Sequence, residues 1–194
     1  MLPPLQHRMQ KEVHMNNLSK IKKFSRGFYL LLTVFLIVLP LYYAGYWIFI
    51  NDFPETLITV NTPSESLVPH HLPAGLRLAG FAACLLPLAA VWYGLFHIRK
   101  LFSYYRSGTI FSFQHVRLFK KIARALMAWV LLSILYESAK SVLFSLGNPP
   151  GQRVLSVGFT SSELTMLLIG GLVFFIAWIM DEGRRLHEEN QLTV

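Results

Sequence analysis

One uncharged run decides the fold: FYLLLTVFLIVLPLYYAGYWIFI, which occupies residues 28–50. A helix of about 20 apolar residues spans the hydrocarbon core of a bilayer, so this run is long enough to cross a membrane. A secretory signal peptide has an apolar region of about 7–15 residues and then a small-residue cleavage site, whereas this run ends in aromatic residues typical of membrane interfaces. We therefore predict a membrane-spanning helix over residues 27–50.

Three more apolar runs follow the first one, at residues 78–96, 122–146 and 164–180. The middle one contains Glu137 and Lys140, whereas the other two are uncharged. With their flanking residues, these runs predict helices at about 77–98, 113–146 and 161–190. The expected fold is an all-α membrane protein, a four-transmembrane-helix bundle over residues 27–190, with tails at 1–26 and 191–194.

The composition agrees with a membrane protein. Charged residues make up 14% of the chain and apolar residues 54%, whereas soluble domains carry about 25% charged residues. Cys84 is the only cysteine in the sequence, so an intramolecular disulfide and a cysteine-based metal cluster are both excluded. Its position inside an apolar run is typical of a small buried hydrophobic residue.

Basic residues are concentrated on one side of the predicted membrane. They are Arg8, Lys11, Lys20, Lys22, Lys23 and Arg26 before the first helix, and Arg99, Lys100, Arg106, Arg117, Lys120, Lys121 and Arg124 between the second and third helices. The opposite side has only Arg153 and the border residue Arg77. The positive-inside rule then places both termini in the cytoplasm of a bacterial inner membrane. The net charge of +8 is explained by this topology and by attraction to anionic headgroups, so we expect no nucleic-acid partner.

Two peripheral regions have weaker signals. Met15 is a natural start for the chain, so we expect residues 1–14 to be an upstream, disordered extension. The β-branched stretches at residues 56–60 and 153–157 fit either a small two-stranded pairing between the external loops or two irregular loops.

Two motifs lie on the predicted cytoplasmic side. The first is LFSYYRSGTIFS at residues 101–112, followed by Val116-Arg117 and KKIARAL at 120–126; the second is DEGRRLHEENQLTV at 181–194. Together they resemble bacterial membrane proteins grouped as domain of unknown function family 2975, over most of the chain after Met15. The resemblance implies four membrane helices and brings no known reaction. The genes of this family often lie beside the gene of a small helix-turn-helix regulator, so the resemblance also implies such a regulator as a partner.

Physical arguments explain parts of both motifs. Gly108 permits a turn, and the Ser112 side chain can cap the next helix by accepting a backbone N–H. Acidic residues of the C-terminal motif face the basic connection in the same compartment, so we expect the two to meet. The candidate cytoplasmic interaction surface consists of Arg106, Gly108, Ser112, Arg117, Lys120, Lys121, Arg185, Glu188 and Glu189.

Glu137 and Lys140 are the most unusual residues because ionisable groups inside a membrane are costly. Their i,i+3 spacing places them on one helix face, where they can pair. A functional interpretation makes Glu137 a proton- or ligand-responsive carboxylate. The interpretation we favour is a structural cluster at the outer side of the membrane, with Arg77 as third member.

Other candidate sites have simpler explanations. His70-His71 with Glu65 lacks a further ligand cluster, so we expect no metal site. Glu163 follows Thr160 by three residues, the spacing of a capping box. Small residues at positions 79, 83, 87, 90 and 94 fit internal helix packing or the face of a homo-oligomer.

The sequence leaves three functions open. Catalytic and phosphate-binding motifs are absent from it, so we expect neither enzymatic activity nor a cofactor. A regulatory or sensory membrane protein is favoured, because a small transporter or channel subunit needs more polar groups near the midplane. A structural assembly subunit is the third alternative.

Overall fold

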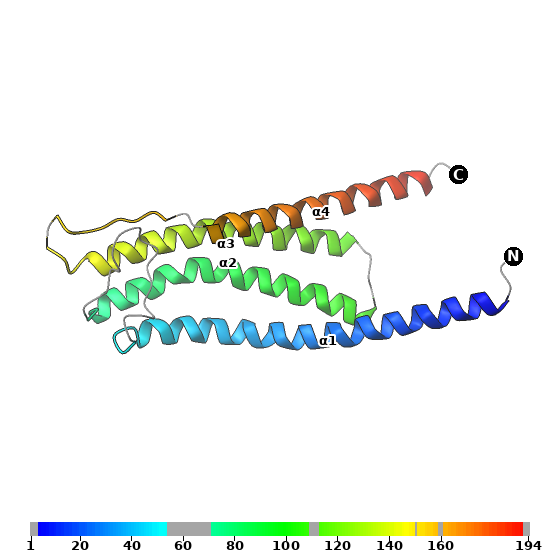
Figure 1. Cartoon of the computed structure of the whole chain (residues 1–194), viewed down its shortest axis with the longest axis horizontal. Helices are drawn as coiled ribbons and strands as arrows, with labels where there is room; N and C mark the ends of the chain where they lie inside the picture. The colour runs from blue at the N-terminus through cyan, green and yellow to red at the C-terminus, as the bar shows by residue number, and fades with distance from the viewer. Residues whose placement is uncertain (1–3, 54–70, 109–112, 150, 159–160, 192–194) are drawn as a thin grey trace.

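The computed structural model describes residues 4–53, 71–108, 113–149, 151–158 and 161–191, with side chains from Ser19 onward within these ranges, apart from those at 184 and 186–191. It contains four helices in these ranges: α1 (Pro4–Ile48), α2 (Ala74–Ser107), α3 (Phe113–Ser145) and α4 (Ser161–Gln191). All four run along the long axis of the molecule (Figure 1). The prediction of an all-helical chain with these four helices is therefore confirmed.

Three of the helices are long and apolar enough to cross a membrane, over Ser19–Ile48, Ala74–Ser107 and Ser161–Gly183. The chain is thus an α-helical protein with the helices of an integral membrane protein. α3 is not among the three, and its apolar part is interrupted by Glu137 and Lys140. It packs between α2 and α4, which are both among the three.

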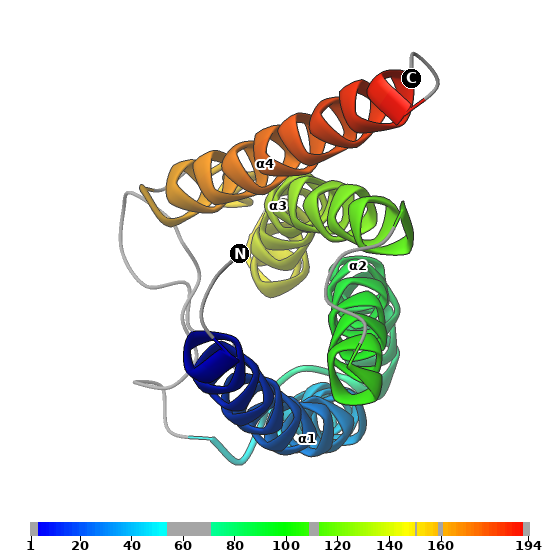
Figure 2. The same ribbon diagram turned by 90° about the vertical axis from the view of Figure 1, so that its right-hand side faces the viewer.

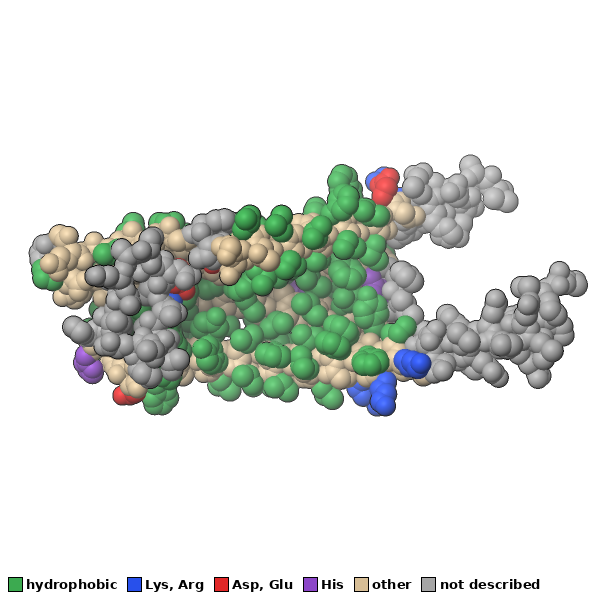
Figure 3. All heavy atoms as spheres, in the orientation of Figure 1, with side chains coloured by type: hydrophobic (Ala, Val, Ile, Leu, Met, Phe, Trp, Pro, Cys, Tyr) green, Lys and Arg blue, Asp and Glu red, His purple; other side chains and the backbone are tan. Residues whose placement is uncertain are grey.

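The four helices of the bundle are arranged as an open arc. Each packs on its neighbour in the chain, and the described parts of α1 and α4 do not meet. The end-on view in Figure 2 shows the arc, with its opening between α1 and α4. Apolar side chains gather along the middle of the face that opens between α1 and α4 (Figure 3). Lipid tails are as apolar as leucine, so there is no hydrophobic driving force for helices in a membrane to pack into a closed ring.

The two ends of the arc differ in what they contain. The start of α1 and the end of α4 lie at one end, together with the end of α2 and the start of α3, and α1 and α4 project beyond these ends of α2 and α3 (Figure 1). We call this the terminal end. The end of α1, the start of α2 and the end of α3 lie towards the opposite end, which we call the far end.

Two local expectations need correction. α1 begins at Pro4, so residues 4–14 are helical and not disordered; proline is tolerated in a first helical turn, and the residues after it include good helix formers. The described residues contain no strand, and residues 56–60 lie outside them. The other half of the expected strand pair is bonded to α3 instead: Val154 N–H donates to Ser145 Oγ at 3.1 Å and Ser156 N–H donates to Ser141 Oγ at 3.0 Å.

Candidate functional site

The charged pair inside the apolar part of α3 is formed as its spacing indicates. Lys140 Nζ donates to Glu137 Oε1 at 2.8 Å, and the two side chains are 8% and 22% exposed. The Lys140 ammonium also lies 5.4 Å from the centroid of the Tyr136 ring. Glu137 Oε2 is buried without a hydrogen-bond partner. The pair is therefore compensated in charge, but one carboxylate oxygen has unused capacity to accept a hydrogen bond.

Aromatic side chains bring α1 close to this pair. Trp47 is 2% exposed and packs against Gly80 of α2, where an added Cβ would overlap the indole ring. The indole also contacts the ring of Phe144 on α3, with the centroids 6.2 Å apart. Tyr43 and Tyr46 are close enough to Glu137 to interact with it electrostatically. We call Tyr43, Tyr46, Trp47, Tyr136 and Phe144 the aromatic cluster; it joins α1, α2 and α3 beside the pair.

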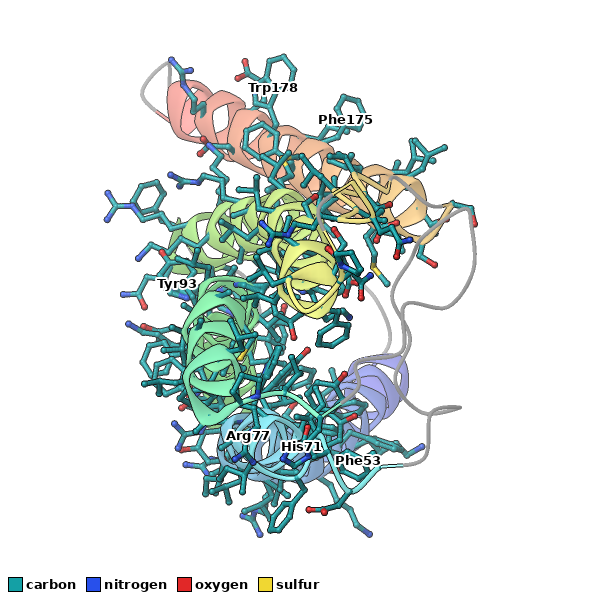
Figure 4. The ribbon with its side chains drawn as sticks, turned by 90° about the vertical axis from the view of Figure 1, so that its left-hand side faces the viewer. Phe53, His71, Arg77, Tyr93, Phe175 and Trp178 are labelled. Atoms are coloured by element: carbon teal, nitrogen blue, oxygen red, sulfur yellow. The ribbon has the colours of Figure 1, made fainter. Side chains whose placement is uncertain are left out.

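Arg77 does not join the pair in the described structure. Its Nη1 donates to the carbonyl of Ile48 at 2.9 Å, which is one of the last carbonyls of α1 and has no partner within its own helix. Figure 4 shows Arg77 where α1 and α2 meet at the far end. The expected triad is therefore a pair on α3 and a separate cap on α1.

A side-chain amide holds together the two ends of the α1–α2 connection. Asn51 Oδ1 accepts a hydrogen bond from Leu72 N–H at 2.9 Å, and Asn51 Nδ2 donates to the Leu72 carbonyl at 3.1 Å. The Asn51 side chain therefore satisfies both the backbone N–H and the backbone carbonyl of Leu72. Leu72 is 4% exposed, so this bond fixes the entry into α2 against the aromatic cluster.

At the terminal end, one tyrosine of α1 is held by two arginines of α2. Arg99 Nη2 donates to Tyr29 Oη at 2.5 Å, and Arg99 Nε donates to Thr33 Oγ1 at 2.8 Å. The guanidinium of Arg106 lies 4.7 Å from the centroid of the Tyr29 ring. These contacts combine hydrogen bonding with cation–π attraction. Part of the basic charge predicted to face the cytoplasm therefore fastens α1 to α2.

Gly108 makes the turn that its position predicts. It ends α2 in the left-handed region, with φ of 90°, and its N–H points to the carbonyls of Tyr104 and Tyr105. A side chain is rarely tolerated at this φ, and a Cβ here would also lie 2.9 Å from Lys22 Cε on α1. After the connection, His115 is buried against the rings of Tyr104 and Tyr105, with centroid distances of 5.6 and 5.0 Å.

Among the described side chains, one ion pair joins the basic start of α3 to the acidic motif of α4. Lys120 Nζ lies 2.6 Å from Asp181 Oδ2, and the two side chains are 28% and 21% exposed. The other candidates on this surface are placed differently. Arg117 stacks on Phe113, its own neighbour on α3, at 4.2 Å, and Arg185 lies 3.9 Å from Glu182 within α4. Lys121 is exposed.

Several predicted positions lie outside the described residues, among them Ser112, His70, Glu65 and Thr160, and the side chains of Glu188 and Glu189. Within the part of the chain that the structure describes, no group of three metal-binding side chains occurs.

Three residues that matter to the arrangement were not singled out from the sequence. They are Gly80, Asn51 and Tyr29. Only Asn51 has a visible signal, since it is the first polar residue after the apolar run. Gly80 and Tyr29 matter because of the partners that they meet across helices, and a single sequence does not show those partners.

The fold and these sites define a helical integral membrane protein whose helices are arranged in an open arc. Residues 61–194 match the family model described as "Protein of unknown function (DUF2975)". The chain belongs to this family, as its two motifs indicated. The match covers α2, α3 and α4. No curated protein matches the chain, and no solved structure matches it either.

Proposed function

We propose that this chain is a multi-pass protein of a bacterial inner membrane, with the terminal end in the cytoplasm. In this proposal α3 crosses the membrane as the fourth span, because it lies between two helices that are long and apolar enough to cross. The basic residues near the N-terminus of α1's apolar part and in the α2–α3 region lie towards the terminal end. The positive-inside rule places such an end in the cytoplasm.

We further propose that the protein acts as a regulatory or sensory membrane partner of a small soluble helix-turn-helix protein. The observation that carries this proposal is the Lys120–Asp181 ion pair of 2.6 Å between α3 and α4. It connects the two motifs by which the family is recognised.

The energy of this ion pair suits an exchangeable contact. Partly exposed ion pairs contribute about 0–1 kcal/mol, since their attraction is offset by desolvation and by ordering of the side chains. A carboxylate on a soluble partner can therefore replace Asp181 at Lys120 at little cost. Release of Asp181 would free the last turns of α4, so partner binding and the position of α4 would be coupled.

The test is affinity purification of the tagged full-length protein in a mild detergent at low salt. We expect a soluble helix-turn-helix protein to co-purify, and the amount to change when Asp181 is replaced by Asn, which keeps the shape and removes the charge. Arg153→Gln, an exposed charge change at the far end, is the matched control and should change nothing. If no soluble protein is enriched over the empty membrane, the proposal fails.

The same experiment separates the alternatives. Recovery of a polytopic transport protein instead of a soluble one would favour a transporter or channel subunit, or an assembly subunit. An enzymatic role is not proposed, since the sequence carries no catalytic motif.

A further inference from the structure

A groove between α1 and α2 at the far end has no part in the proposal above. Its volume is about 350 Å³. Its walls are apolar side chains of both helices, among them Ala44 and Ile48 of α1 and Leu78 and Phe81 of α2. Arg77 is the one charged residue of its lining among the residues that the structure describes. The groove is thus an apolar slot with a single cation in its wall.

The Arg77 guanidinium is held in place but is not saturated. One bond is described, from Nη1 to the Ile48 carbonyl at 2.9 Å, and Nε is buried without a hydrogen-bond partner. A guanidinium has five N–H donors in a planar fork, which suits bidentate binding of phosphate. Arg77 also lies in the first turn of α2, where the helix dipole favours an anion. This corner of the groove therefore attracts negative charge.

The charged part and the apolar part of the groove follow one another along the membrane normal. Arg77 lies close to the end of α1 at Ile48 and the start of α2 at Ala74, so it is near the border of the apolar span. Phe81 is one helical turn further along α2, and Ala44 one turn further back along α1, both towards the middle of the membrane. An occupant that fits has an anionic group at the border and an apolar chain that runs parallel to the helices.

We propose that this groove binds an anionic phospholipid, with its phosphate on Arg77 and one acyl chain between α1 and α2. Charge complementarity selects a lipid with net negative charge. The volume lies near the lower limit of the range for small-molecule sites, about 300–1,000 Å³, so it suits one chain and not a helix of a second protein. The inference does not depend on the soluble partner, since the groove is at the opposite end of the molecule.

Trp47 lines the groove and supplies the probe. The experiment uses the full-length chain with Trp92, Trp129 and Trp178 replaced by Phe, so that Trp47 alone emits. The protein is reconstituted into phosphatidylcholine vesicles that contain a fraction of phosphatidylglycerol brominated on its acyl chains. Bromine quenches a nearby indole, so the loss of emission measures occupancy by that lipid. We expect brominated phosphatidylglycerol to occupy the site about fivefold more strongly than brominated phosphatidylcholine, the factor that corresponds to about 1 kcal/mol per basic residue.

Two variants test the two parts of the groove separately. Arg77→Gln should abolish the preference for the anionic lipid, whereas Ala44→Phe should fill the slot and reduce quenching by both lipids with Arg77 intact. Arg153→Gln removes a far-end charge outside the groove and should leave the preference unchanged. Equal quenching by the two lipids in the parent protein, or a preference that survives Arg77→Gln, would overturn the proposal. So would protein dimers whose formation protects Trp47 from both lipids.

Discussion

The far end and the terminal end of the arc differ in how much charged side chains add to the apolar contacts between helices. At the far end, the indole of Trp47 packs directly on Gly80 and the Asn51 amide binds the backbone of Leu72. At the terminal end, apolar packing of Leu101 with Leu118 and Ile122 joins α2 and α3. Charged side chains add further contacts between helices there, as in Arg99 with Tyr29 and Lys120 with Asp181. Apolar packing and neutral hydrogen bonds are insensitive to salt, whereas exposed ionic contacts are screened by it. The difference indicates that the terminal end is the more sensitive of the two ends to ionic strength.

The charged pair beside the aromatic cluster should give the largest effect on stability. Lys140→Met leaves the Glu137 carboxylate buried without its cation, and such a loss costs about 3–5 kcal/mol. Thermal unfolding in detergent, followed by circular dichroism, should therefore show a clearly lower Tm. Adding Glu137→Gln to Lys140→Met should recover most of the loss. A double variant no more stable than the single one would mean that the two residues do not depend on each other, and would favour a separate role for Glu137.

Gly80 should give the next largest effect. A Cβ at this position would overlap Cη2 of Trp47, so Gly80→Ala must displace the indole, and overpacking of this kind costs about 1–3 kcal/mol. Gly75→Ala is the matched control on the same helix, because nothing lies within 4 Å of the added Cβ. The same unfolding measurement should show a loss for Gly80→Ala and little change for Gly75→Ala. Equal Tm values for the two variants would contradict the packing of Trp47 on α2.

Replacement of Asn51 should have a smaller effect on stability, and it tests the contact between the two ends of the α1–α2 connection. Asn51→Ala leaves the N–H and the carbonyl of Leu72 without partners, and an unpaired polar group costs about 1–3 kcal/mol when buried. Because this site is only partly buried, we expect the lower part of that range. Asn51→Asp keeps the acceptor for the Leu72 N–H and should lose less. Faster limited proteolysis within the α1–α2 connection of Asn51→Ala, compared with the parent, would provide a second measure; identical rates would argue against the clamp.

The Lys120–Asp181 pair should have the smallest effect on stability, about 0–1 kcal/mol. Lys120→Ala should therefore leave Tm nearly unchanged but make α4 more accessible to protease near Asp181. Exchange of the two charges, Lys120→Asp with Asp181→Lys, should restore the protection. A fall in Tm comparable to that of Gly80→Ala would contradict the distinction between the two ends.

The sequence predicted the parts of this structure that depend on neighbours along the chain. The apolar runs located the helices, the i,i+3 spacing anticipated the pairing of Glu137 with Lys140, and Gly108 marked the turn that ends α2. The contact of Trp47 with Gly80 was not predictable, since it joins residues far apart in the chain and any small residue on α2 was a comparable candidate.

The open arc could not be predicted for a related reason. α1 and α4 are apolar on nearly all faces, and only 11% of the most apolar window of each is buried by protein. A helix surrounded by lipid and a helix surrounded by protein therefore have similar sequences. Phe175 and Trp178 illustrate this, because both are large apolar residues that project from α4 away from the other helices (Figure 4).

The most direct test of the distinction between the two ends is a pair of distance distributions from pulsed electron paramagnetic resonance, in a Cys84→Ser background. One pair of spin labels replaces Phe24 on α1 and Arg185 on α4, at the terminal end; the other replaces Phe49 and Leu155, at the far end. All four side chains are exposed. Raising the salt concentration should shift or broaden the Phe24–Arg185 distribution and leave the Phe49–Leu155 distribution unchanged. A terminal-end distribution that is insensitive to salt, or a far-end distribution that broadens with it, would contradict the account.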